Sequence, residues 1–234
     1  MRFNAGKLLH SPFFRVLFTW FWMLVSPFVV ALAVASIFGI GIQGVVDYIE
    51  SHRSLLVYIE IVSVGLVPVL FMILSKEDVT RYGIKKEGIL ESIVPSVLFV
   101  FVVYGLSYFL GGQLISFEFP QFQLSFPLNL WYVFLGLLAY GPLEVYFIVW
   151  LIENTDRVWG WGGGPLSTGV GVTVVVFAFM HILTTRSLIN SVNVLIIFLF
   201  FGLVYKYTGN SVGPMIAWTL VNRQALLAAS ILFN

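Results

Sequence analysis

The sequence predicts an all-α, polytopic transmembrane bundle of about seven helices, and three observations support this fold class. First, 59% of the residues are hydrophobic, only 10% are charged and the mean hydropathy is +0.99, which soluble globular domains do not show. Second, the runs 16–38 and 192–204 are apolar on nearly every face, which favours helices over the alternating strands of a barrel. Third, 234 residues supply about seven spans of roughly 20 residues each.

Each expected span is an apolar run bounded by charged or turn residues. The run after Arg15 is far longer than the apolar core of a secretory signal, so it is expected to stay in the mature protein. Pro27, Pro68 and Pro95 fall inside spans and predict kinks rather than helix ends. An eighth span remains open if the first run or the glycine-rich segment 160–171 conceals a break. The expected spans are 16–42, 55–74, 89–110, 129–151, 170–187, 188–205 and 212–233.

The basic residues are distributed unevenly between the two sides of the predicted bundle. Nine lie on the side of the N-terminus and two on the other, which places the N-terminus in the cytoplasm and, with seven spans, the C-terminus outside the cell membrane. The chain has no internal repeat, low-complexity tract or linker, so residues 1–234 are expected to form one integral membrane domain. The nine are Arg2, Lys7, Arg15, Lys76, Arg81, Lys85, Lys86, Arg157 and Lys206, and the two are Arg53 and Arg186.

Three polar residues, Glu144, His181 and Asn222, lie inside predicted spans. A charged side chain at such depth costs roughly 2.5–3.5 kcal/mol on insertion scales, so it is usually paired, hydrated or functional. Counting from the cytoplasmic ends of the spans places them at depths of ~10, ~16 and ~15 Å, respectively. These depths predict a shared polar pocket near the inner leaflet. Glu60 and Glu91 lie nearer the ends of their spans, where interfacial water is expected to reach them.

Two helical pairs extend this pattern, because Phe177 and His181 share one helix face and Trp218 and Asn222 share another. The segment Phe177-Ala-Phe-Met-His181 resembles the Phe-x-x-x-His motif of the CAAX-protease and bacteriocin-processing family of intramembrane endopeptidases, also called the Abi family. The segment 202–222 resembles the stretch that ends in the family's His-x-x-x-Asn motif. Gly141-Pro-Leu-Glu144 resembles the start of its Glu-Glu-x-x-x-Arg motif. The resemblance covers residues 75–230.

The chain departs from these motifs at three places. Glu144 stands first or second in the glutamate motif, and in either register one carboxylate and the arginine are missing. Trp218 stands where the family has histidine, and an indole donates one hydrogen bond but accepts none. The residues in the vacant places are Val145 and Val149 in one register, and Leu143 and Ile148 in the other.

The resemblance implies an intramembrane endopeptidase of the CAAX prenyl protease type. Glu144 would activate a water against a peptide bond, His181 would hold the water or transfer a proton, and Asn222 would donate to the oxyanion. Phe177, Trp218 and Arg223 would line the site. The substrate would be a membrane-associated protein or peptide, either a prenylated tail or a leader peptide.

No cofactor is expected. The chain has no cysteine, and one glutamate, one histidine and one amide are a poor ligand set for zinc. Membrane lipid and a peptide or protein substrate are the expected partners, and nucleic acid is not.

Two alternatives remain open. Glu144 could form a structural ion pair with Arg223, which follows Asn222 at similar depth. The chain could also be a catalytically impaired relative that binds a helix, lipid or peptide in the membrane. A small transporter would show symmetric halves with broken helices, which the sequence lacks.

Overall fold

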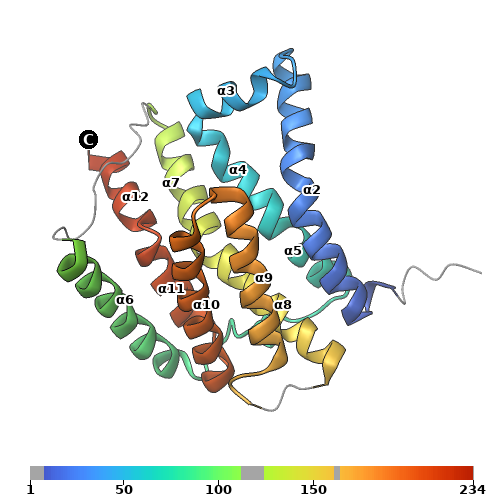
Figure 1. The fold of residues 1–234 in the computed structure, drawn as a ribbon, viewed down its shortest axis with the longest axis vertical. Coiled ribbons are helices and arrows are strands. Elements are labelled where there is room, and N and C mark those ends of the chain that lie inside the picture. The colour runs from blue at the N-terminus through green and yellow to red at the C-terminus, as the bar shows by residue number, and fades with distance from the viewer. Residues whose placement is uncertain (1–7, 112–123, 161–163, 234) are drawn as a thin grey trace, which may run out of the picture.

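The computed structural model describes residues 8–111, 124–160 and 164–233, and within these ranges all regular structure is helical. Figure 1 shows the helices as one bundle, which confirms the predicted all-α class. The α-helices are α2 (Pro12–Phe38), α3 (Gly44–Ser51), α4 (Leu56–Glu60), α5 (Leu66–Leu74), α6 (Ile89–Gly111), α7 (Leu128–Leu138), α8 (Glu144–Trp159), α9 (Thr168–Thr185), α10 (Leu188–Thr208), α11 (Val212–Val221) and α12 (Gln224–Phe233). The 3₁₀-helices are η1 (Arg53–Leu55) and η3 (Val79–Tyr82), and the π-helices are η2 (Ile61–Gly65) and η4 (Ala139–Leu143).

The structure does not confirm the count of seven spans. Among the described residues, five helices are long and apolar enough to cross a membrane, and the bent pair α11 and α12 raises the count to six. The predicted span 170–187 corresponds to a shorter apolar helix, and the predicted span 212–233 is broken by a bend of 60°. This bend occurs because Arg223 adopts a left-handed φ of 61°, which ends a right-handed helix. The long apolar helices make the chain an integral membrane protein.

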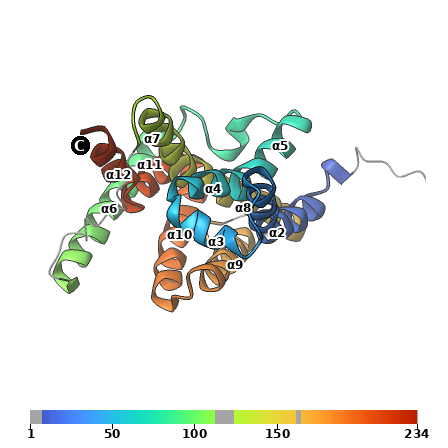
Figure 2. The same cartoon turned by 90° about the horizontal axis from the view of Figure 1, so that it is seen from above.

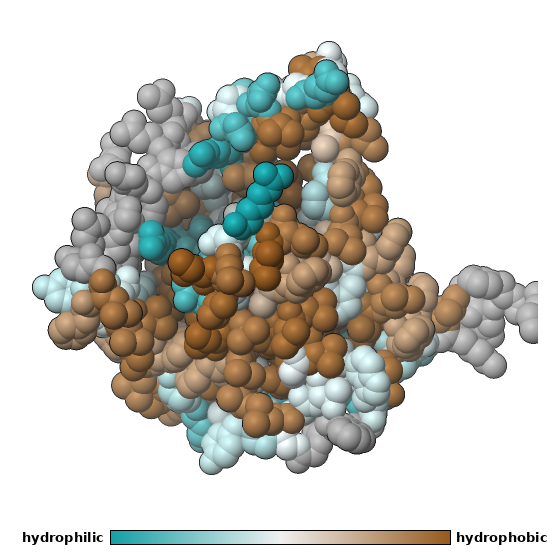
Figure 3. Space-filling view, in the orientation of Figure 1, coloured by the Kyte–Doolittle hydropathy of each residue, from teal (hydrophilic) through white to brown (hydrophobic). Residues whose placement is uncertain are grey.

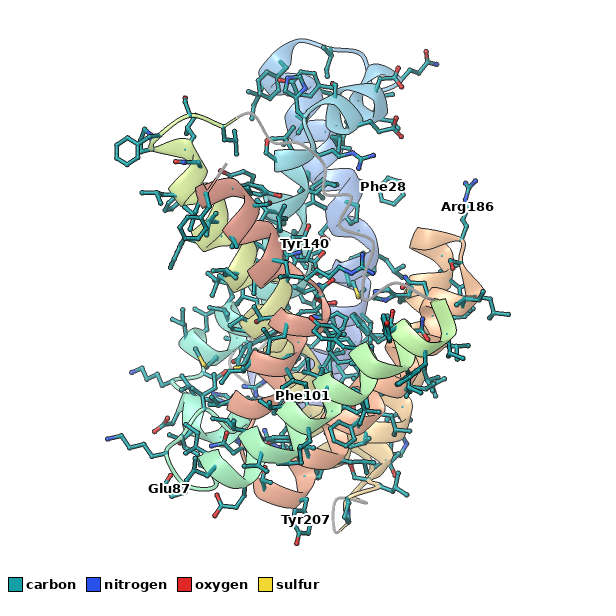
Figure 4. The ribbon with its side chains drawn as sticks, turned by 90° about the vertical axis from the view of Figure 1, so that its left-hand side faces the viewer. Phe28, Glu87, Phe101, Tyr140, Arg186 and Tyr207 are labelled. Atoms are coloured by element: carbon teal, nitrogen blue, oxygen red, sulfur yellow. The ribbon has the colours of Figure 1, made fainter. Side chains whose placement is uncertain are left out.

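The surface agrees with this assignment. Figure 3 shows hydrophobic residues over most of the visible face, with hydrophilic residues gathered mainly towards its upper and lower parts. Phe28 and Phe101 are 72% and 68% exposed, and in Figure 4 they lie on the outside of the bundle. A contiguous apolar exterior of this kind fits lipid rather than water.

One end of the bundle, here called the basic end, contains the 75–88 loop, the C-terminal end of α8 and the turn between α10 and α11 (Figure 1). A buried network joins the start of α2 to this loop. Arg15 is 1% exposed, and its guanidinium donates to Glu77 at 2.9 Å and to Ser75 at 2.6 Å. Burial alone would raise the pKa of Glu77, but hydrogen bonds from Tyr82 and Arg15 and the charges of Arg15 and Arg81 lower it below its ordinary value.

The turn before α11 is bound to the same loop. Asn210 donates through Nδ2 to the carbonyls of Lys85 at 2.7 Å and Glu87 at 3.0 Å. Gly83 has a φ of +80°, and a Cβ there would lie 2.7 Å from the backbone nitrogen of Ser211, so only glycine permits this approach. These contacts fix the position from which α11 enters the bundle.

Helix α8 is the most enclosed helix of the bundle. The eight residues from Val145 to Ile152 are all buried, because the helix packs against α2, α9, α10 and α11. Figure 2 shows α8 between α2 on one side and α6 and α12 on the other. Gly169 brings α9 against α8 so closely that a Cβ would lie 2.3 Å from the Ile152 carbonyl oxygen. The start of α8, which carries Glu144, is therefore held rigidly inside the protein.

Candidate active site

Glu144 begins α8 immediately after the π-helix η4. Pro142 has no backbone N–H to complete a regular helical ladder, and Tyr140 has the non-helical angles φ −89° and ψ 19°. Gly141 lets α11 approach the kink, because a Cβ there would lie 2.0 Å from the Thr219 hydroxyl. Single π-turns of this type are common at functional sites. Figure 4 shows Tyr140 in the interior, away from Glu87 and Tyr207 at the basic end.

The Glu144 carboxylate is 4% exposed and accepts a hydrogen bond from Trp218 Nε1 at 2.7 Å. Within the described residues, the ion pairs all involve Glu77, Glu153 or Asp156. Glu144 is therefore not paired with Arg223, and the alternative of a structural ion pair is wrong. The indole that replaces the family's histidine supplies a neutral donor to one carboxylate oxygen.

Asn222 lies at the end of α11 and not inside a continuous helix. Its Nδ2 donates to the Tyr140 carbonyl oxygen at 3.4 Å, so the amide reaches the kink one turn before Glu144. Arg223 follows at the bend and is exposed. It interacts electrostatically with Tyr104, whose hydroxyl donates to the Leu220 carbonyl at the same break. Two interrupted helices thus meet beside Glu144.

His181 lies on α9 and is partly buried. Its Nδ1 is 3.2 Å from the Phe177 carbonyl oxygen, and its ring centroid is 4.7 Å from that of Phe177. Phe177 contacts Phe198 at 5.1 Å, and Phe198 contacts Trp218 at 4.7 Å. The imidazole is therefore connected to the Trp218 indole through two phenylalanine rings. The structure brings Glu144, Trp218 and Asn222 to the kink, while His181 lies further along the aromatic cluster.

The site contains a carboxylate to which sequence reasoning assigned no role. Glu60 is the last residue of α4, is partly buried, and is followed directly by the π-helix η2. It interacts electrostatically with Glu144 and with Tyr140. Glu60 is partly exposed, and its access to interfacial water stays a prediction, whereas Glu91 is exposed as expected. The available signal was the apolar sequence on both sides of Glu60, which marks an ionisable residue inside a span.

The ligand set for a metal is incomplete at this place. Within residues 8–111, 124–160 and 164–233, no group of three or more histidine, aspartate or glutamate side chains is placed to hold a metal ion. Glu60 and Glu144 supply two carboxylates that interact with each other, and His181 contacts Phe177 of the aromatic cluster. The arrangement thus offers a buried carboxylate, a neutral donor to it and a nearby amide.

One comparison with known proteins identifies part of the chain. Residues 125–223 match the family model described as Type II CAAX prenyl endopeptidase Rce1-like. This segment is less than half of the chain, runs from the start of α7 to the bend after α11, and contains all six predicted site residues. The match confirms the resemblance that the motifs indicated. No curated protein and no solved structure matches the chain.

Proposed function

Because residues 125–223 form an Rce1-like segment of the CAAX-type intramembrane protease family, we propose that this protein is an intramembrane endopeptidase. It hydrolyses a peptide bond of a membrane-associated protein or peptide, with a prenylated tail or a leader peptide as the substrate class. The observation that carries the proposal is the buried Glu144 carboxylate at a helix kink, with Trp218 holding one oxygen at 2.7 Å.

In this mechanism Glu144 is the general base. Trp218 binds Oε2 and fixes the carboxylate, so Oε1 can accept a proton from a water molecule. The water oxygen attacks the carbonyl carbon, and Glu144 then passes the proton to the leaving amine as the C–N bond breaks. The carboxylate lies where η4 meets α8, beside the bend between α11 and α12. In an unbroken pair of helices, packed side chains would fill this place.

Asn222 is the proposed oxyanion donor. Its amide nitrogen carries two N–H groups, and one of them points to the Tyr140 carbonyl at the long distance of 3.4 Å. The other can donate to the negative oxygen that forms in the transition state. His181 is the proposed proton carrier on the α9 side of the site, beyond Phe177. Phe177, Trp218 and Arg223 are the proposed lining residues.

The basic end supports a proposed orientation. The 75–88 loop carries four basic residues and the ends of α8 and α10 carry two more, and they lie at one end of the bundle (Figure 1). Because cytoplasmic loops are enriched in lysine and arginine, this end faces the cytoplasm, with the N-terminus on the same side of the cell membrane. The six are Lys76, Arg81, Lys85, Lys86, Arg157 and Lys206.

A second function is a non-catalytic binding protein of the same family. The observation that favours it is the chain of ring contacts through Phe177 and Phe198 that links His181 to the Trp218 indole. Such a protein would hold a partner helix, lipid or peptide without cleaving it.

The two functions are separated by a cleavage assay on the full chain in lipid vesicles. The substrates are a farnesylated peptide, a leader-type peptide and an unmodified control peptide, and the products are identified by mass spectrometry. The native protein is expected to cleave one class, Glu144→Gln to lower kcat/KM by roughly 10²–10⁴-fold, and His181→Ala to slow the reaction. The exposed Glu91→Gln is the matched control and should behave as native. Equal turnover by Glu144→Gln would remove Glu144 from catalysis, and binding without cleavage by the native chain would favour the second function.

A further inference from the structure

Two carboxylates from different spans lie at two π-helical turns that pack on each other. Glu60 ends α4 just before η2, and Glu144 begins α8 just after η4. The two π-helices are in contact, α4 also contacts η4, and α8 also contacts η2. Gly65 in η2 sits so close to η4 that a Cβ would lie 3.1 Å from the Leu143 side chain. The backbone therefore brings the two glutamates to one junction.

Tyr140 lies in η4 at this junction and interacts with both carboxylates. Its phenol interacts electrostatically with Glu60, Glu144 and Tyr132, and Glu60 in turn interacts with Glu144. Besides the two glutamates themselves, the titratable group shown to interact with both of them is the Tyr140 phenol, which stays neutral at physiological pH.

Between described residues, no ion pair links a cation to either glutamate of this pair. Each ion pair of the described residues belongs to Glu77, Glu153 or Asp156, and none to Glu60 or Glu144. Two carboxylates in one poorly hydrated place cannot both be ionised, because each negative charge disfavours the other. Such a pair holds one proton over a wide range of pH, and its two titration steps belong to the pair and not to either residue.

We propose that Glu60 is a positioning residue of the active site, which shares a single proton with Glu144, and that the Trp218 N–H bound to the Glu144 carboxylate favours Glu144 as the ionised member. In this role Glu60, from outside the Rce1-like segment, stands in for the second carboxylate that the glutamate motif lacks. The catalytic role of Glu60 rests on the proposed function. The sharing of one proton between Glu60 and Glu144 does not depend on it.

The number of protons on the pair is the same before and after one turnover. Glu144 takes one proton from the attacking water and returns that proton to the leaving amine nitrogen when the C–N bond breaks. Glu60 keeps its own proton throughout, so the pair carries one proton before and after each turnover. A second proton would block Glu144 at low pH, and loss of the shared proton would add a second negative charge at high pH. Activity is therefore expected to follow a bell-shaped pH profile.

Titration of the carboxyl groups tests the pair without any need for cleavage. The full chain in vesicles is followed by infrared spectroscopy of protonated carboxyl groups as the pH is raised, for the native protein, Glu60→Gln, Glu144→Gln and the control Glu91→Gln. Each variant removes one member of the pair, so the upper titration step should fall by at least about one pH unit or disappear in both. The control should keep it. An upper step that persists unchanged in Glu60→Gln would overturn the proposal.

The pH profile of cleavage gives the second readout. Glutamine resembles a protonated glutamate, so Glu60→Gln should retain cleavage near neutral pH while the decline at high pH is lost. A merely structural role for Glu60 would lower activity equally at every pH. If the native chain cleaves nothing but the reciprocal titration shift is seen, the proposed protease function fails and the proton-sharing pair stands. If cleavage depends on Glu144 but neither the profile nor the titration responds to Glu60→Gln, the protease function stands and Glu60 has no role.

Discussion

At the basic end, Glu77, Glu153 and Asp156 each lie 2.9–3.9 Å from an arginine or lysine nitrogen, whereas the described residues offer no such cation to Glu60 and Glu144 inside the bundle. The ion-paired carboxylates connect loops and helix ends, and arginine or lysine side chains balance their charges. In the interior pair, the Trp218 indole holds Glu144, and a phenol interacts with both carboxylates. This difference separates carboxylates held in ion pairs from the two carboxylates that we propose for the reaction.

The largest effect on stability is expected where the basic end is most buried. Arg15→Met removes a guanidinium that is 1% exposed and leaves Glu77 without its buried cation, which should lower the free energy of unfolding by about 3 kcal/mol. The measurement is unfolding of the purified protein in mixed micelles. Arg81→Met is the matched control, because Arg81 contacts the same carboxylate through a side chain that is 45% exposed, and its effect should stay below about 1 kcal/mol. Equal losses from both variants would show that burial of Arg15 is not what matters.

A smaller effect is expected at the interior pair. Trp218→Phe keeps an aromatic ring against Phe198 but removes the N–H that binds Glu144, and a buried carboxylate that loses a donor costs about 1–3 kcal/mol. In the proposed mechanism kcat/KM should also fall by roughly tenfold, which corresponds to about 1.4 kcal/mol. Trp218→His, whose ring can donate, should retain more of both. An unchanged kcat/KM in Trp218→Phe would mean that the indole does not position Glu144.

The smallest effect is a difference in pH dependence. Because the pKa of Glu77 is lower in the folded protein than its ordinary value of 4.5, the contribution of Glu77 is present above that value and is lost as the pH falls through the lowered pKa. Acid unfolding should therefore be steeper in the native protein than in Glu77→Gln, by at most one bound proton. The exposed Glu91→Gln should keep the native slope. If the free energy of unfolding fell with the same slope against pH in the native protein and in Glu77→Gln, the lowered pKa of Glu77 would be contradicted.

The sequence predicted the bundle well because long apolar runs leave few alternatives to membrane helices. The same apolar runs do not reveal where a helix is interrupted, because the sequence 212–233 gives no signal for the left-handed φ of Arg223. This bend moves Asn222 from the middle of a span to a helix end, where its amide can reach Tyr140. The two π-turns were likewise invisible to a count of residues along a regular helix.

Depth alone was too coarse to define the site. Glu144, His181 and Asn222 were predicted to meet because their depths agreed, and for His181 this stays a prediction, because lateral position depends on which helix faces turn together. Phe177 and Phe198 lie between His181 and the Trp218 indole, and Glu60 reaches the site from a span that lacks any family motif. The ring contacts of His181 and the position of Glu60 both depend on how the helices pack, and residue spacing in a single sequence does not specify that packing.

The most direct test of the central claim is chemical labelling with dicyclohexylcarbodiimide, an apolar reagent that modifies protonated carboxyl groups within the membrane. The native chain in vesicles near neutral pH should be labelled once per molecule, on Glu60 or Glu144, because that pair holds one proton and has no cation partner among the described residues. Peptide mass spectrometry locates the label. Labelling confined to Glu77, Glu153 or Asp156, or two labels on the interior pair of one molecule, would contradict the account.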